Sequence, residues 1–73
     1  MKLTDGATYT LPDGTLVRAR VPLLGSVRLH LADGTPAYLL DRGQWKSLCY
    51  DAVTEGYQAA PCDLVDADLV PVF

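Results

Sequence analysis

Two segments of the chain, residues 15–21 and 27–32, alternate between apolar and polar side chains. In the first segment, Val17, Ala19 and Val21 stand at every second position, and two arginines lie between them. In the second segment, a valine and two leucines alternate with an arginine and a histidine. A period of two is typical of a β-strand with one buried face. We therefore expect two antiparallel strands with aliphatic side chains in a core and charged side chains on the outer face.

Turn signals separate the apolar runs at three Asp-Gly pairs: Asp5-Gly6, Asp13-Gly14 and Asp33-Gly34. Asp favours tight turns and Gly adopts positive φ without steric cost, so such pairs reverse an extended chain. The Pro-Asp-Gly sequence at residues 12–14 predicts a three-residue bulged loop that pairs Leu11 with Thr15. The same loop pairs Tyr9 with Val17, so the turn chemistry and the apolar pattern agree on this hairpin.

Two further strands are expected at residues 36–41 and 44–51, joined by a turn at Arg42-Gly43. Between residues 52 and 61 the pattern is weaker. That segment is compatible with another hairpin, closed by a Glu-Gly pair, or with a loop that contains a helical turn.

The C-terminal part of the chain predicts one short helical turn over residues 63–69, with Asp63 or Asp66 as its N-cap. Residues 70–73 are expected to form a last short strand. The whole chain, residues 1–73, is thus expected to be one small all-β domain: an SH3-like barrel or a strongly curled antiparallel meander of five to six short strands. The resemblance to SH3-like barrels lies in the order of the elements alone, and an OB-like barrel or an open curled sheet competes with it.

Apolar residues make up 49% of the 73 residues, more than the core of so short a chain usually absorbs. Some leucines and valines must therefore lie at the surface, where they favour association with a partner. Leu23 and Leu24 fall in the loop after the first alternating segment, and the strand parity places Leu40 and Leu48 outward. Together with a sheet edge, these leucines are expected to bind another protein or a second copy of the chain, which would give a homo-oligomer.

The net charge is −3, and it is unevenly distributed. Residues 1–46 contain all six basic residues and four acidic ones, a balance of +2. Residues 47–73 contain five acidic residues and no basic one, a balance of −5. The first two thirds of the protein are therefore expected to present a local positive face.

Four cationic side chains are expected to share that face: Arg18, Arg20, Arg28 and His30. Any register that buries the aliphatic residues brings them together across the two alternating strands. Two accounts of the face stay open. In one, an external polyanion binds there; in the other, acidic side chains of the C-terminal segment fold back over it, namely Asp63, Asp66 and Asp68.

Further outward residues join the cationic side chains if the next two turns are three-residue bulged loops: Tyr38, Lys46 and Tyr50. The same parity turns three residues inward: Ala37, Leu39 and Trp45. Two-residue loops would instead place the tyrosine at position 38 in the core. Aromatic residues interleaved with bases on a small barrel can stack nucleobases while the cations follow phosphates.

No catalytic residue, metal site or cofactor is expected. His30 is the only histidine, and Cys49 is expected on the opposite face, so a Cys-His nucleophile pair is not predicted. Two cysteines thirteen residues apart and one histidine lack the short paired spacing of a zinc site. The Asp-x-x-Asp-x-Asp sequence that begins at residue 63 lacks the Gly and Glu of an EF-hand loop.

Two cysteines are also too few for a disulfide framework, and we expect reduced thiols in a cytoplasmic protein, with a Cys49–Cys62 bridge as the alternative. Neither a membrane-spanning apolar run nor a secretory signal pattern is evident. The sequence therefore predicts a non-catalytic binding module for a protein partner or for itself. The alternative function is single-stranded nucleic-acid binding through the cationic strand face.

Overall fold

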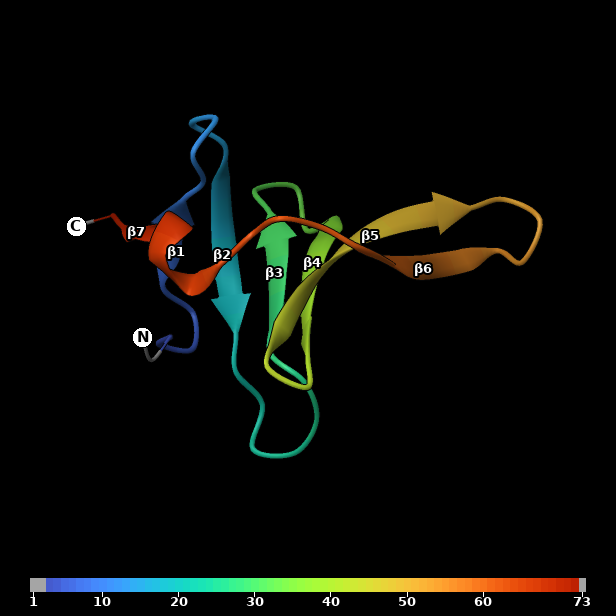
Figure 1. Cartoon of the computed structure of the whole chain (residues 1–73), viewed down its shortest axis with the longest axis horizontal. Coiled ribbons are helices and arrows are strands. Elements are labelled where there is room, and N and C mark those ends of the chain that lie inside the picture. The colour runs from blue at the N-terminus through green and yellow to red at the C-terminus, as the bar shows by residue number, and fades with distance from the viewer. Residues whose placement is uncertain (1–2, 73) are drawn as a thin grey trace.

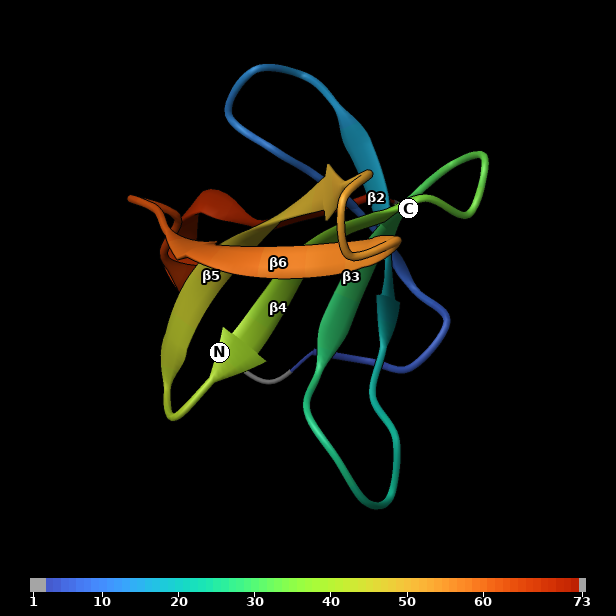
Figure 2. The ribbon, with the colours of Figure 1, turned by 90° about the vertical axis from the view of Figure 1, so that its right-hand side faces the viewer.

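Seven strands form one antiparallel sheet in the computed structural model, which describes residues 3–72. The strands are β1 (Thr8–Thr10), β2 (Leu16–Arg20), β3 (Arg28–Leu31), β4 (Pro36–Asp41), β5 (Gln44–Asp51), β6 (Gly56–Pro61) and β7 (Val70–Pro71). Strands β1 to β6 form a meander, and β7 returns to the outer side of β1 (Figure 1). The sheet is strongly twisted, so that β5 and β6 run across the direction of β2 (Figure 2). An all-β antiparallel fold is thereby confirmed.

The sheet does not close into the SH3-like barrel that was one of the expected architectures. The two edge strands, β6 and β7, do not pair with each other. Strand β7 has only two residues, of which Pro71 has no backbone N–H to donate, so it covers β1 and extends the sheet no further. Seven strands replace the expected five to six, because both the β5–β6 hairpin and the C-terminal strand form. Phe73, which the expected last strand included, lies outside the described residues.

The expected helical turn is a short 3-10 turn, η1 (Asp66–Asp68). Neither Asp63 nor Asp66 is its N-cap, because the turn follows Val65, which is extended. The carboxylate of Asp68 accepts a hydrogen bond from the backbone N–H of Val65 at 3.2 Å and so satisfies that group from within the turn. Within residues 3–72, no helix is long and apolar enough to cross a lipid bilayer.

The core lies on one face of the sheet. Its buried side chains are Tyr9, Leu11, Val17, Ala19, Leu29, Trp45 and Leu69. The β1–β2 hairpin has the expected form: the N–H of Leu11 donates to the carbonyl of Thr15 at 2.8 Å, and Tyr9 pairs with Val17.

The segment that connects β6 to β7, residues 62–69, runs across this face of the sheet (Figure 1). Leu69 of this segment is buried in the core, and Cys62 and Leu64 pack against it. The acidic C-terminal segment therefore covers the core with its apolar side chains.

A β-bulge in β4 reverses the inward and outward positions that the sequence predicts there. The register places His30 opposite Pro36 and Leu29 opposite Tyr38. Ala37 is therefore an additional residue in β4. Tyr38 lies on the core side with Leu29 and packs against the core, so the prediction that it extends the cationic face is wrong.

A second departure follows at the turn between β4 and β5. Arg42 and Gly43 form a two-residue loop with φ values of 52° and 79°, where a three-residue loop was expected. The bulge and the shorter loop reverse the parity twice, so Trp45 lies inward and Lys46 outward as predicted. Leu40, by contrast, was predicted to lie outward and packs against the core.

Candidate binding surfaces

The face of the sheet opposite to the core carries four cationic side chains, here called the cationic face: Arg18, Arg20, Arg28 and His30. In the β2–β3 pairing, Arg18 lies directly opposite His30, and Arg20 lies directly opposite Arg28. These residues alternate with buried ones, since successive side chains of a strand point to opposite faces. The structure thus brings together all four residues that the alternating pattern predicts.

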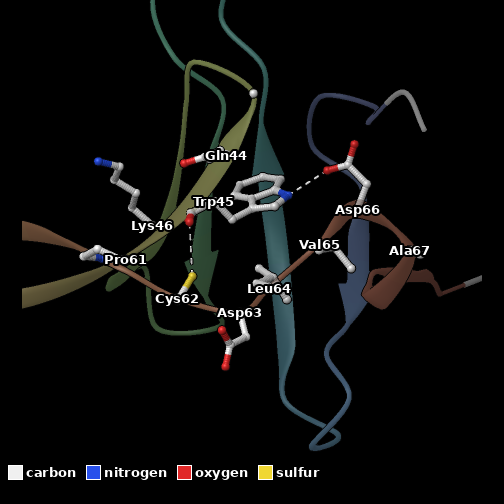
Figure 3. Close-up of a pocket in the computed structure, with 11 residues that line it drawn as sticks. Gln44, Trp45, Lys46, Pro61, Cys62, Asp63, Leu64, Val65, Asp66 and Ala67 are labelled. Atoms are coloured by element: carbon white, nitrogen blue, oxygen red, sulfur yellow. Dashed lines mark hydrogen bonds between the residues drawn. The ribbon is translucent and has the colours of Figure 1, made fainter.

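Carboxylates do not neutralise the cationic face. Among residues 3–72, none of its three arginines forms an ion pair. The acidic segment lies on the core side of the sheet, where the carboxylate of Asp66 accepts a hydrogen bond from the indole N–H of Trp45 at 2.7 Å (Figure 3). The account in which the C-terminal carboxylates fold back over the arginines is therefore wrong.

A shallow depression of about 680 Å³ lies in the cationic face. Its lining includes Arg18, Arg20 and His30 together with one acidic residue, Asp5. The Asp5 carboxylate accepts a hydrogen bond from the backbone N–H of Val21 at 2.9 Å. The depression therefore has more cationic than anionic groups around it.

His30 is the residue of the cationic face with the most constrained surroundings. Its Nδ1 atom is buried and has no hydrogen-bond partner. Burial and the positive charges of Arg20 and Arg28 lower the pKa of the imidazole below 6.5. The neutral form of His30 is therefore favoured near neutral pH while no anion is bound.

Beyond β3, the same side of the sheet continues across β4 and β5. Leu39 pairs with Arg28 on one side and with Lys46 on the other, so Lys46 lies on the side of the cationic face. Leu39 was expected to point inward, and the bulge in β4 accounts for its outward position. The ammonium group of Lys46 lies 3.8 Å from the carboxylate of Asp41.

Two tyrosines lie further along the same side, on the β5–β6 hairpin. Tyr50 and Tyr57 are paired across the two strands and are 59% and 44% exposed. Their rings meet edge to face, with centroids 5.5 Å apart and an interplanar angle of 70°. Tyr50 was predicted to lie outward, whereas Tyr57 was not singled out, because residues 52–61 gave no decisive pattern. The signal for it was the Glu-Gly pair, which does close the hairpin.

The outer side of β6 is an open edge of the sheet. Gly56–Pro61 pairs with β5 alone, and four of its residues are exposed: Tyr57, Gln58, Ala59 and Pro61. No Lys, Arg, Asp or Glu lies within these six positions. The sequence predicts a binding edge in general terms, but it does not identify which strand provides it.

The leucines expected at the surface divide into two groups. Leu23 and Leu24 are fully exposed in the β2–β3 loop, whereas Leu40 and Leu48 are partly buried. The β2–β3 loop and β6 project in different directions from the molecule (Figure 1). The two exposed leucines therefore form no continuous surface with the β6 edge, and their role in binding stays a prediction.

An open groove of about 710 Å³ lies on the core side, between the start of β5 and residues 61–67 (Figure 3). The thiol of Cys62 donates a hydrogen bond to the carbonyl of Trp45 at 3.3 Å. Cys49 lies four residues further along β5, about 13 Å away at the rise of a strand, which is too far for a disulfide. Both cysteines are free. His30 lies on the opposite face, so this geometry supplies neither thiol with an imidazole base.

Within the described part of the chain, no group of His, Cys, Asp and Glu side chains is arranged to hold a metal ion. No protein-family model, curated protein or solved structure matches the chain. The function of the protein therefore has to follow from the chemistry of its own surfaces, of which the cationic face and the β6 edge are the most distinctive.

Proposed function

We propose that this protein is a small non-catalytic binding module that associates with a second copy of itself through the edge of β6. The observation that carries the proposal is the composition of this edge: six uncharged residues whose outer side pairs with no strand among residues 3–72. Unpaired N–H and C=O groups along such an edge are a template for another strand, and proteins usually protect them with charges, bulges or short strands.

The contrast with the other edge supports the choice of β6. Strand β7 is only two residues long, and Pro71 withholds one donor from an approaching strand. Strand β6 has a proline only at its last position, Pro61. One edge of the sheet is therefore protected, and the other is open.

The absence of charge also favours a second copy as the occupant. Two β6 strands that pair antiparallel are related by a two-fold axis, so each residue near the axis lies close to its own counterpart. A charged strand would repel itself in this arrangement, because like charges on facing strands are destabilising. The β5–β6 hairpin extends away from the rest of the molecule, which leaves the edge accessible (Figure 1).

The test is the concentration dependence of the molecular mass, measured by sedimentation equilibrium from micromolar to millimolar protein. We expect a monomer–dimer equilibrium for the natural chain. Ala59 is exposed in the middle of β6, and Ala59→Lys would place two positive charges near the two-fold axis. This variant is expected to weaken the dimer about tenfold, which corresponds to about 1.4 kcal/mol.

Ala59→Gln is the matched control, since glutamine extends the side chain at the same position without a charge. It is expected to dimerise more tightly than Ala59→Lys. A strict monomer over the whole range would overturn the proposal and leave the edge to a strand of a different protein. A dimer that Ala59→Lys leaves unchanged would show that another surface carries the contact.

A further inference from the structure

We infer that the cationic face binds the phosphate groups of a single-stranded nucleic acid. The inference goes beyond self-association through β6, because it concerns the opposite end of the sheet and depends on different residues.

The first argument is the uncompensated charge. Arg20 and Arg28 face each other directly, and in the described residues neither has a carboxylate partner. Like charges placed opposite each other on neighbouring strands are destabilising. An oxyanion that binds between them turns this repulsion into two charge-assisted hydrogen-bonding interactions.

The second argument is the spacing of the arginines. Arg18 and Arg20 lie two positions apart on one strand, about 6.7 Å, and Arg28 lies on the neighbouring strand, about 4.8 Å from Arg20 across the sheet. Each guanidinium group presents a planar set of donors that suits a phosphate. Their separation allows adjacent phosphates of one strand to be bound by different arginines.

The third argument is the environment of His30 in the depression. The charged groups that face it are Arg18 and Arg20 from β2, Arg28 from its own strand, and Asp5 from the segment before β1. Three of these four charges are positive and disfavour the imidazolium form. A bound phosphate supplies the negative charge that stabilises this form, so His30 would gain a proton as the anion binds.

The tyrosines favour nucleic acid over an acidic peptide. Lys46, Tyr50 and Tyr57 lie on the same side of the sheet as the arginines, and both tyrosine rings are partly exposed. Nucleobases stack on exposed aromatic rings while the backbone follows cations, which is how sheet surfaces bind single strands. An acidic peptide would engage the cations alone and has no use for the rings.

The test is an amide-resolved NMR titration with three separate probes: a short mixed-sequence single-stranded DNA, a polyglutamate peptide and inorganic phosphate. We expect the DNA to shift the amides of the cationic face and of the tyrosine pair, and to bind more tightly than the other two probes. The affinity should fall steeply with salt. The His30 imidazole should titrate at a higher pH in the DNA complex than in the free protein.

The double variant Arg20→Gln, Arg28→Gln tests the assignment without a new charge on the sheet. It removes a repulsive pair, so it is expected to stay folded, which its amide spectrum verifies. We expect it to bind DNA at least tenfold more weakly and to reduce the slope of log affinity against log salt by about two. Arg42→Gln, which removes an arginine from the β4–β5 turn, is the matched control and should change binding much less.

Three outcomes would overturn the inference. In the first, DNA causes no shifts at low salt. In the second, the double variant binds DNA as the natural chain does. In the third, polyglutamate binds the same residues as tightly as DNA, which would assign the cationic face to an acidic protein partner.

Discussion

His30 is the residue of the cationic face whose charge changes nearest to neutral pH. Its surroundings disfavour the protonated form, since burial and the neighbours Arg20 and Arg28 lower its pKa below 6.5. In the unfolded chain these neighbours are dispersed, and the imidazole takes up a proton at its ordinary pKa. The unfolded state therefore binds more protons than the folded state once the pH falls to about 6.5.

This difference predicts that the protein loses stability as the pH drops through 6.5. His30→Asn is expected to remove that loss while leaving the acid unfolding at lower pH. The measurement is urea denaturation at several pH values above and below 6.5, followed by the fluorescence of the single buried tryptophan, Trp45. A natural chain whose stability rises on acidification in this range would contradict the prediction.

Acidic residues contribute in a separate and lower pH range. Hydrogen bonds from Thr15 and Thr35 lower the pKa values of Asp13 and Asp33 below 3.8. Their contribution to stability is present above that value and is lost as the pH falls below it. The effect of His30 can therefore be measured before these carboxylates are protonated.

The hydrogen bond from Trp45 to Asp66 ties η1 to the sheet. Asp66→Ala is expected to lower the free energy of unfolding by about 1–3 kcal/mol, because the buried indole N–H then loses a charged acceptor. Asp63→Ala is the matched control on the same segment, since Asp63 is exposed, and should change stability by less than about 0.5 kcal/mol. Equal losses in urea denaturation of the two variants would show that the hydrogen bond is not the source of the effect.

At the scale of the elements, the β4–β5 turn contains a local conflict between sequence and conformation. Arg42 adopts a φ of 52°, a left-handed conformation that costs an ordinary residue about 1–2 kcal/mol. Asn is preferred at the first position of such a two-residue turn. Arg42→Asn is therefore expected to raise the free energy of unfolding by about 0.5–1 kcal/mol, measured by urea denaturation.

Arg42→Gln separates the turn effect from the loss of a positive charge. Glutamine has no preference for positive φ, so this variant should gain little or no stability. If both variants are stabilised equally, the charge and not the turn conformation is responsible.

The hairpins show how far sequence patterns determine the elements. The β1–β2 hairpin was predictable, because Pro-Asp-Gly and the alternating apolar residues require the same register. The bulge in β4 was not, because Ala37 carries no local signal for an additional residue. The cationic face was predicted in full from two alternating strands, whereas Tyr38 was misplaced because its orientation depends on that bulge.

At the scale of the whole molecule, barrel closure was beyond the sequence pattern. Closure requires the first and last strands of the meander to meet, and short-range turn signals contain no information about such long-range pairing. The position of the acidic segment is a similar case. Its leucines pack on the core face, and this packing directs the carboxylates away from the arginines.

The unequal edges of the sheet determine where assembly would stop. Two sheets of seven strands, joined through β6, would form one sheet of fourteen with a β7 strand at each end. Both ends are then two residues long and contain Pro71, so neither offers a template for a third copy. A chain with two open edges would add copies without limit and form fibres. The two-residue strand β7 thus acts as a terminator that limits the number of copies to two.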